Sequence, residues 1–344
     1  MVDDAGSSQR IQGPWVNGAV ARPGIEQKAV SCAARVPSGI AQGLSPRRKG
    51  TIGIICTTRP QSSREDVNLG YHDEPLGGVI AQTRAADWSL LVSFWDGVNA
   101  PDVPRLDAIA GKVDGILIGE GSFPARLLER LAARVPVVII AGTPLTREYD
   151  VVTTGTRAAA AAIVTHLVRE HGSRRLLHLG GPVGAPETGE RQAAIEQALR
   201  DHPDSRLVGA MYGSFGAETG AELAALILSA TNGQQPDAIV CANDQMAISL
   251  LRNLTEAGLQ VPRDVAVVGF GDAIPGRLTD PPLTTVHQPM RMVGARACAR
   301  LIGRIAAPGL PPSVELLPSE LVIRSSCGCP PGTSIRQPVQ PAHE

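Results

Sequence analysis

Short runs of apolar residues recur along most of the chain, and stretches with helical spacing separate them. The run at residues 238–242 has strand length and no polar alternation, which is typical of a parallel strand covered by helices on both faces. The next stretch spaces its apolar residues as a helix does, and Gly258 stands where a helix end favours glycine. A second apolar run follows at 265–270. This segment therefore predicts one βαβ unit.

The same alternation extends over most of the sequence. Apolar runs predict strands at residues 52–56, 90–94, 115–118, 135–140, 176–179, 206–211, 238–242, 265–270 and 321–323. Helical spacing predicts helices at residues 74–86, 106–110, 126–133, 158–170, 190–200, 217–230 and 293–305. Such alternation gives parallel sheets with right-handed crossovers. Because the pattern restarts near Asp150, we expect an α/β fold of two doubly wound lobes.

The composition is typical of a globular protein without membrane-spanning segments. Its 344 residues, 43% of them hydrophobic and 19% charged, suffice for two cores and a small appendage. No apolar run approaches the ~18 residues of a membrane span, and no apolar signal core follows the N-terminus. We therefore predict a cytoplasmic protein. Residues 330–344 are Pro-rich and polar, which predicts a disordered tail without a coiled coil.

The cysteines and histidines suggest neither disulfides nor a metal. Cys327-Gly-Cys329 is the only close cysteine pair, and without a second ligand pair it is a weak metal motif. The seven histidines show no ligand spacing, and His166 and His178 read as structural. We predict no metal and no cofactor. G-x-S-x-G, P-loop and H-E-x-x-H motifs are also absent, so we expect no enzyme.

Charge is distributed unevenly along the chain. Residues 1–50 hold seven Lys or Arg against three acids, a local charge of +4, which leaves −5 for the rest of a chain with net charge −1. A basic arm on a mildly acidic body suits nucleic acid, although linkers often carry such a charge too.

Six segments in order resemble one family. They are TIGII at 51–55, DGILI at 114–118, VPVVII at 135–140, ANDQMA at 242–247, VPRDVAVVGF at 261–270 and PPLTTVHQP at 281–289. Over about residues 37–326 the chain resembles the lactose/galactose-repressor (LacI/GalR) family of transcriptional regulators. The resemblance implies a type I periplasmic-binding-protein fold, with three crossovers, a small-molecule effector between the lobes and a homodimer.

The resemblance also implies a domain division. A degenerate helix-turn-helix-like segment would occupy residues 1–36, a hinge helix and linker 37–50, and the ligand-binding core 51–329. Within the core, the N-lobe would comprise about 51–150 and 288–316, and the C-lobe about 151–287 and 317–329.

Five residues match effector-binding positions of the family or their surroundings. Arg191 matches an arginine that grips ligand hydroxyls or carboxylates, and its planar fork of donors suits that task. Asn243 matches a polar contact, although it could equally cap a helix. Phe215 matches an aromatic that stacks on the ligand, and Tyr71 stands where an aromatic often follows the first strand. Asp272 and Asn243 follow strands at the sheet edge where α/β folds bind ligands.

The sequence departs from the family where acceptors are usual. Gly271, Ala141 and the pair Gly155-Thr156 stand where members often carry Asp, Asp and Asp-Asn. A site without these acceptors has less means to hold a polyhydroxylated sugar. We therefore expect either a ligand that is smaller, less polar or anionic, or a site that binds weakly.

The N-terminal segment resembles a damaged DNA-binding domain. Residues 37–44 resemble the hinge, with Leu44 at the position of an apolar wedge for the minor groove. Gln9 and Arg10 would hold base-reading positions. Pro14 falls inside the recognition helix, where proline costs ~3 kcal/mol or more. Too few residues precede Ala5 to build the first helix, so we expect either a decayed domain or a different true start.

Three functions follow from these observations. The first is a dimeric regulator of the repressor type that binds an operator DNA and whose affinity for it changes with a small-molecule effector. The second is a cytoplasmic ligand-binding sensor of the same fold that has lost sequence-specific DNA binding. The third, an extracytoplasmic solute-binding protein, lacks the signal peptide that it would need.

Overall fold

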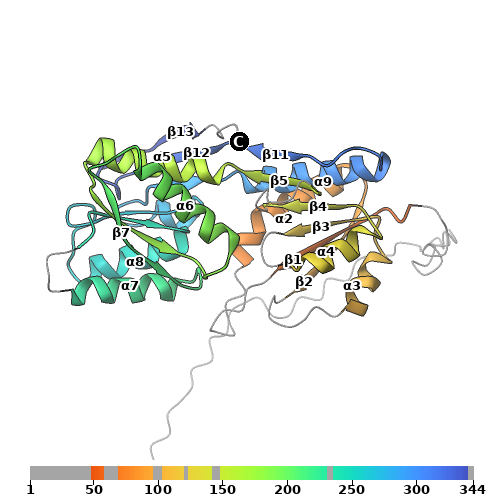
Figure 1. Cartoon of the computed structure of the whole chain (residues 1–344), viewed down its shortest axis with the longest axis horizontal. Coiled ribbons are helices and arrows are strands. Elements are labelled where there is room, and N and C mark those ends of the chain that lie inside the picture. The colour runs from red at the N-terminus through yellow and green to blue at the C-terminus, as the bar shows by residue number, and fades with distance from the viewer. Residues whose placement is uncertain are drawn as a thin grey trace, which may run out of the picture.

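The computed structural model describes residues 48–57, 69–95, 103–119, 123–141, 148–230 and 235–339. These residues form two lobes that lie side by side and are joined along one edge (Figure 1). Each lobe is a parallel sheet covered by helices, so the predicted α/β fold class is confirmed. The helix-turn-helix-like segment and the hinge, with Gln9, Arg10 and Leu44, lie outside the described residues.

The N-lobe is built on a six-stranded sheet in the order β11-β5-β4-β3-β1-β2, and all its pairings are parallel. Its strands are β1 Thr51–Thr57, β2 Ser89–Trp95, β3 Gly115–Gly119, β4 Val137–Ile140, β5 Asp150–Thr154 and β11 Val314–Leu317. Its helices are α2 Leu69–Ala85, α3 Val103–Ala110, α4 Ala125–Ala132 and α9 Met290–Ala306.

Helices on both faces explain why the N-lobe strands are apolar without alternation. In β1, Ile54 packs into a core cluster with α9, whereas its neighbour Ile55 packs into a cluster with α3 and α4. Successive side chains of a strand point to opposite faces, so both faces must be apolar when both are covered.

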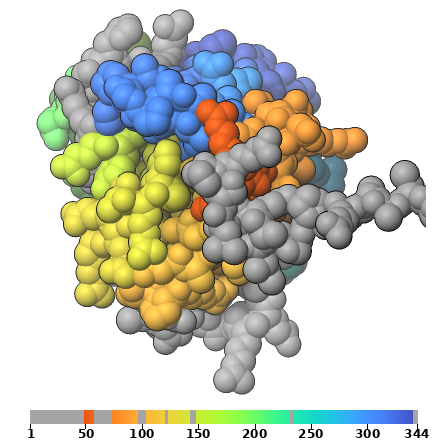
Figure 2. Space-filling view, turned by 90° about the vertical axis from the view of Figure 1, so that its right-hand side faces the viewer, coloured from red at the N-terminus to blue at the C-terminus, as the bar shows by residue number. Residues whose placement is uncertain are grey.

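The helices α2 and α9 touch at two glycines. A Cβ at Gly294 would lie 2.0 Å from the carbonyl oxygen of Pro75, and one at Gly78 would lie 1.9 Å from that of Arg291. Figure 2 views the molecule from the N-lobe end and shows the orange residues of α2 beside the blue residues of α9. The glycines therefore allow the two helix backbones to approach each other directly.

The C-lobe is built on a four-stranded parallel sheet in the order β7-β6-β8-β9. Its strands are β6 Arg175–Gly180, β7 Arg206–Tyr212, β8 Ala238–Cys241 and β9 Ala266–Val268. Its helices are α5 Thr156–His171, α6 Pro186–Leu199, α7 Ala217–Ser229 and α8 Asp244–Glu256. Val240 packs with α5 and α6, and the adjacent Ile239 packs with α7 and α8, so this sheet is also covered on both faces.

Three segments pass between the lobes within the described residues. They run from β5 to α5, from β10 (Thr285–His287) to α9, and from β11 to β12 (Ser319–Ile323). The first passage lies at Gly155 rather than near Asp150, because Asp150–Thr154 forms β5 in the N-lobe sheet. A buried hydrogen bond of 2.6 Å from the Gln288 amide to the Thr154 hydroxyl ties the first passage to the second.

The expectation of a disordered tail is wrong for Ile335–Val339, which is ordered. This segment forms β13, which pairs antiparallel with β12 in a sheet of order β10-β12-β13. Arg336 in β13 also donates to the Glu320 carboxylate at 2.7 Å. Backbone pairing and this ion pair order a segment whose composition alone indicates disorder. None of the described helices combines the length and the apolar character needed to cross a membrane.

Candidate ligand site

The carboxyl edge of the C-lobe sheet brings several predicted site residues together. Asn243 follows β8 and caps α8, because its Oδ1 accepts from the backbone N–H of Met246 at 2.9 Å. Its Nδ2 donates to the carbonyl of Phe215 at 2.8 Å. Both ends of the amide thus hold backbone groups, which joins the start of α8 to the loop before α7.

Phe215 lies in that loop with a φ of 70°, in the left-handed region. Its half-buried ring lies against Gly181, after β6: a Cβ there would be 2.0 Å from the ring's Cζ. The position of the ring therefore requires a glycine at residue 181, because a side chain there would clash with it. This contact places Phe215 beside the turn that leads to α6.

Arg191 projects from α6 into the same edge and is only 8% exposed. Its Nη1 donates to the carbonyl of Ala242 at 2.8 Å, and its Cζ lies 4.5 Å from the centroid of the Phe270 ring. Its Nε has no hydrogen-bond partner among the described residues. A buried guanidinium donor without an acceptor is costly, and an acceptor that reached it would relieve this cost.

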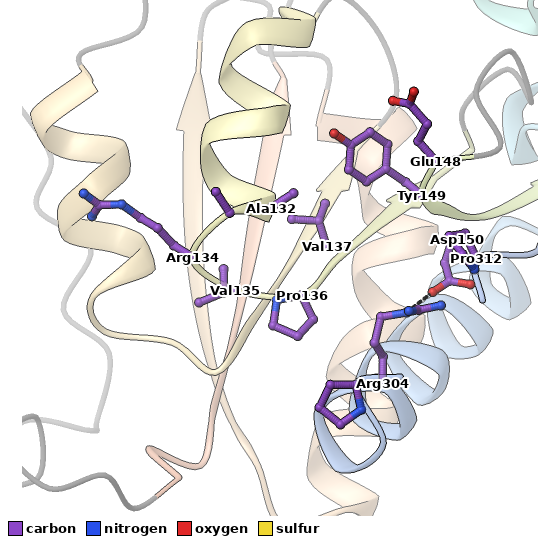
Figure 3. A pocket seen from close by; sticks show the side chains of 12 residues that line it. Ala132, Arg134, Val135, Pro136, Val137, Glu148, Tyr149, Asp150, Arg304 and Pro312 are labelled. Carbon is purple, nitrogen blue, oxygen red and sulfur yellow. Dashed lines mark hydrogen bonds and ion pairs between the residues drawn. The ribbon is translucent and has the colours of Figure 1, made fainter. Parts of the chain in front are cut away.

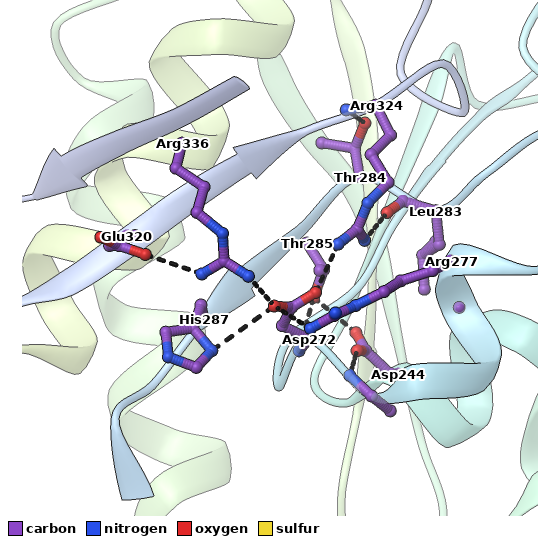
Figure 4. Close-up of polar contacts among 12 residues, drawn as sticks. Asp244, Asp272, Arg277, Leu283, Thr284, Thr285, His287, Glu320, Arg324 and Arg336 are labelled. Atoms are coloured by element: carbon purple, nitrogen blue, oxygen red, sulfur yellow. Dashed lines mark hydrogen bonds and ion pairs between the residues drawn. The ribbon is translucent and has the colours of Figure 1, made fainter. Parts of the chain in front are cut away.

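Asp272 follows β9 and is the centre of a cluster of charged side chains (Figure 4). Its side chain is fully buried, and Arg324 donates to its Oδ1. Its Oδ2 accepts from Arg277 at 2.9 Å and from Arg336 at 2.6 Å, and the Nδ1 of His287 lies 3.5 Å away. Burial alone would raise the pKa of Asp272, but hydrogen bonds from His287 and Arg324 and the charges of Arg324 and Arg277 hold it well below its usual range.

This cluster gives Asp272 partners that the sequence did not predict. Arg324 and Arg336 follow Asp272 by 52 and 64 residues, and no spacing in the sequence relates them to it. Both carboxylate oxygens face donors of the chain itself. That Asp272 also contacts an effector stays a prediction.

Asp244 fastens the start of α8 to the loop after β9. The carboxylate accepts from the Thr285 hydroxyl at 2.5 Å and from the backbone N–H of Ala273 at 2.6 Å. A Cβ at Gly269 would lie 2.2 Å from Oδ1, so glycine makes room for the carboxylate. Burial raises the pKa of Asp244 to about 6, against the opposing effect of these two hydrogen bonds.

Two further groups complete the account of the sequence-predicted residues. Tyr71 lies in α2, but its side chain lies outside the described part of the structure. His178 is fully buried in β6, and its Nδ1 lies 2.9 Å from the carbonyl oxygen of Val240. Burial lowers its pKa to about 4, so the imidazole is neutral and Nδ1 carries the donated hydrogen. The structural interpretation of His178 fits this environment.

The fold also assembles a set of side chains that the sequence does not connect. His166 and His171 of α5 meet Cys327 and Cys329, and one ligand-type atom from each lies within 4.8 Å of the other three. The spacing of the histidines and the lone C-x-C pair gave no sign of this arrangement, because more than 150 residues separate the two pairs.

A separate cavity of about 340 Å³ lies in the N-lobe (Figure 3). It is formed by the segments that lead into β4 and β5 together with the end of α9, and its lining includes Arg134, Tyr149 and Asp150. These segments lie at the amino ends of the strands, away from the carboxyl edge. Asp150 is already paired there with Arg304. The cavity is therefore distinct from the predicted site.

The chain is similar in sequence to a binding-protein-like domain and to transcriptional regulators. Residues 164–327 match a periplasmic binding protein-like domain. The HTH-type transcriptional repressor PurR of Vibrio atlanticus (strain LGP32) is 28% identical over 305 residues, which cover 87% of each chain. The HTH-type transcriptional regulator reg1 of Streptomyces lividans is 34% identical over 224 residues, which cover 59% of this chain and 60% of that one.

Solved structures share the fold. A lac repressor dimer bound to operator and the anti-inducer ONPF superposes with a TM-score of 0.72 at 24% identity, covering 85% of this chain and 86% of that one. The transcriptional regulator CelR in complex with cellobiose gives 0.70 at 23% identity, covering 81% and 85%. At this identity the likeness concerns the fold.

Proposed function

Because the chain belongs to the LacI/GalR family of transcriptional regulators, we propose that a small molecule bound between its lobes controls its affinity for an operator DNA. Residues 51–329 would be the ligand-binding core, and residues 1–36 and 37–50 would supply the DNA-binding segment and the hinge. Gln9 and Arg10 would read bases, and Leu44 would enter the minor groove.

The observation that carries the effector proposal is the buried donor of Arg191. Its Nε is unpartnered among the described residues, whereas three acceptor side chains at the carboxyl edge are occupied by donors of the chain. The amide oxygen of Asn243 accepts from Met246, and the carboxylates of Asp244 and Asp272 hold the contacts given above. A ligand that presents acceptors would complement this edge better than one that presents donors. We therefore propose a small effector with a carboxylate, phosphate or carbonyl group.

The three passages between the lobes would transmit the effect of ligand binding to the hinge segments. A ligand that contacts both lobes stabilises one relative arrangement of them, and it can shift the equilibrium only by its difference in affinity for the two arrangements. Asp272 lies close to the passage from β10 to α9, because its partners include His287 at the end of β10. Lobe rotation at these passages would change the position of the hinge segments on DNA.

A homodimer is proposed as the DNA-binding species. Several large apolar side chains of the described residues are exposed, among them Ile80 of α2 (49%), Phe94 of the edge strand β2 (41%) and, at or beside the short helix η1 (Ile274–Arg277), Ile274 (71%) and Leu278 (82%). Exposed apolar groups of this size favour burial against a partner chain. Sedimentation velocity at micromolar concentration tests this proposal, and a monomer at all concentrations would contradict it.

The central experiment is a fluorescence-anisotropy titration of the full chain against its own upstream DNA and a scrambled duplex at two salt concentrations. The proposal expects tight binding that favours the natural sequence. Weak binding that disappears with salt for both duplexes would indicate only counterion release. The protein would then be a ligand-responsive sensor without an operator, and the control of DNA binding would be refuted.

The effector site is tested by a thermal-shift screen of small carboxylates, phosphate esters and neutral sugars, followed by Arg191→Met. The variant should keep DNA binding but lose the response to the ligand found. Arg263→Met is the control, because among the described residues the exposed Arg263 side chain is hydrogen-bonded to the exposed side chain of Gln260. A ligand response unchanged in Arg191→Met would show that the effector binds elsewhere.

A further inference from the structure

Four side chains with metal-binding atoms converge at the C-terminal end of α5. His166 and His171 come from this helix, whereas Cys327 and Cys329 come from the turn that follows β12. One ligand-type atom of each residue lies within 4.8 Å of the other three. Two imidazoles and two thiols, with no carboxylate among them, form the donor set of a Cys₂His₂ zinc site.

Four of the six separations between these atoms are close to the edges of a tetrahedron around zinc, and all six lie within 4.8 Å. Bonds of about 2.3 Å to sulfur and about 2.0–2.1 Å to nitrogen require about 3.4 Å between two nitrogens and about 3.5 Å between nitrogen and sulfur. The two Nε2 atoms lie 3.3 Å apart. Three of the four nitrogen–sulfur distances are 3.4 Å from His166 to Cys327, 3.5 Å from His171 to Cys329 and 3.8 Å from His166 to Cys329.

The backbone of the turn is built to bring both cysteines to this point. Gly328 between them has a φ of +119°, and a Cβ there would lie 2.7 Å from Nδ1 of His171. Only glycine combines this backbone conformation with the close approach of the imidazole. At the other side, α5 ends at Gly172, whose left-handed cap follows directly after His171. Local backbone structure therefore fixes both the turn that carries the two cysteines and the helix end that carries His171.

We propose that His166, His171, Cys327 and Cys329 bind one Zn²⁺ ion through two Nε2 and two Sγ atoms. Four protein ligands complete a tetrahedral shell and leave no position for water or substrate, so the ion is structural rather than catalytic. Nitrogen and sulfur ligands select zinc over Mg²⁺ or Ca²⁺, which prefer oxygen.

The proposed ion would link α5 to the end of the chain. Cys327 follows Arg324 by three residues, and its thiol, protonated in the metal-free chain, donates to the Arg324 carbonyl at 3.2 Å. Zinc would replace that proton, and Arg324 itself holds Asp272. Beyond Cys329 the chain enters β13, which carries Arg336. Metal binding would therefore fix the turn between β12 and β13 and, with it, two of the arginines that surround Asp272.

The test uses the full chain, purified with thiols reduced and with any affinity tag removed. Metal analysis after incubation with zinc and gel filtration should give about one equivalent per chain. Cobalt substitution should give the intense visible bands of tetrahedral Co²⁺ and a near-ultraviolet thiolate-to-cobalt band. Fewer than about 0.1 equivalents, or weak bands of octahedral cobalt, would overturn the proposal.

Variants locate the metal. Cys329→Ser and His171→Asn should each lose most of the bound zinc, whereas His202→Asn and Cys298→Ala, which change a histidine and a cysteine outside the cluster, should keep it. Full zinc retention in both ligand variants would contradict the assignment. His171→Cys provides a second test that does not depend on a lost ligand: a third thiolate should strengthen the thiolate-to-cobalt band, and an unchanged band would exclude His171 from the shell.

Discussion

Nη2 of Arg336 lies 2.6 Å from Oδ2 of Asp272, although 64 residues separate them. The last strand of the chain thus contacts the carboxyl edge of the C-lobe sheet, where the ligand site is proposed. Arg277, Arg324 and His287 approach the same carboxylate. Because Asp272 is buried, the contribution of each arginine to the stability of the fold depends on how far that arginine is exposed to solvent.

Arg336→Ala should lower the free energy of unfolding by no more than about 1 kcal/mol. The Arg336 side chain is 41% exposed, so solvent screens its charge, and Asp272 keeps its other partners. Urea denaturation measures the change. Arg252→Ala, which removes an exposed pair with Glu256, is the matched control and should cost still less. A loss of several kcal/mol would mean that β13 detaches as a whole.

Arg324→Met should be far more destabilising, by about 3–5 kcal/mol, because its 6% exposed side chain neutralises a fully buried carboxylate. The double variant with Asp272→Asn should recover part of this loss, since no buried charge then remains without its main partner. A double-mutant cycle in urea measures the coupling. If the two losses simply add, the ion pair does not explain the effect.

Acid should act in opposite directions on two neighbouring carboxylates. The pKa of Asp272 is lowered in the folded state, so its contribution to stability is present above the unfolded pKa of ~3.9 and is lost as pH falls below it. The pKa of Asp244 is raised to about 6, so its contribution is full below pH ~4 and is lost as pH rises through 6.

Asp244→Asn should therefore remove a fall in stability between about pH 4 and pH 6, on the order of 2–3 kcal/mol. Absolute stability at acid pH should also drop, because the new amide group can place a donor against the N–H of Ala273. Urea titrations at several pH values give the slope. The exposed Asp201→Asn is the control, and identical slopes in wild type and Asp244→Asn would contradict the assignment.

Gly294→Ala should destabilise the N-lobe by about 1–3 kcal/mol or more, because its Cβ would lie 2.0 Å from a backbone oxygen of α2 and the helices must move apart. Gly303→Ala in the same helix is the matched control. No atom lies within 4 Å of a Cβ at Gly303, so alanine should stabilise the helix by about 0.5–1 kcal/mol. Thermal unfolding of both variants decides the comparison, and equal shifts would count against a direct helix contact.

Most strands were predictable because they are apolar on both faces, as Ile239 and Val240 of β8 illustrate. The strands that the sequence did not reveal carry polar residues whose partners are distant. Glu315 in β11 is paired with Arg296 and Arg300 of α9, and Arg336 in β13 with Glu320. Such pairs let a strand form where its own composition favours a loop, and no local pattern records them.

The same reasoning divides the site residues. Asn243 was recognisable as a helix cap from its place before an amphipathic helix, and its Oδ1 does accept from Met246. The arginines around Asp272 and the Cys₂His₂ cluster were not recognisable, because the fold alone brings their members together from distant segments. One sequence sign was present in retrospect: Cys327-Gly-Cys329 places two thiols around a residue that can adopt positive φ.

The contribution of late residues to both lobes has a consequence for biosynthesis. The N-lobe sheet has β11 at one edge and α9 against α2, and the C-lobe receives Arg324 and Arg336. Neither lobe can complete its packing while the last segment is still inside the ribosome. Until then the nascent chain has unpaired strand edges, and Asp272 lacks its partners Arg324 and Arg336. In this state the chain is open to chaperone binding and to aggregation. The emergence of β13 from the ribosome, more than the emergence of either lobe's central strands, should set the moment at which these lobes complete their folding.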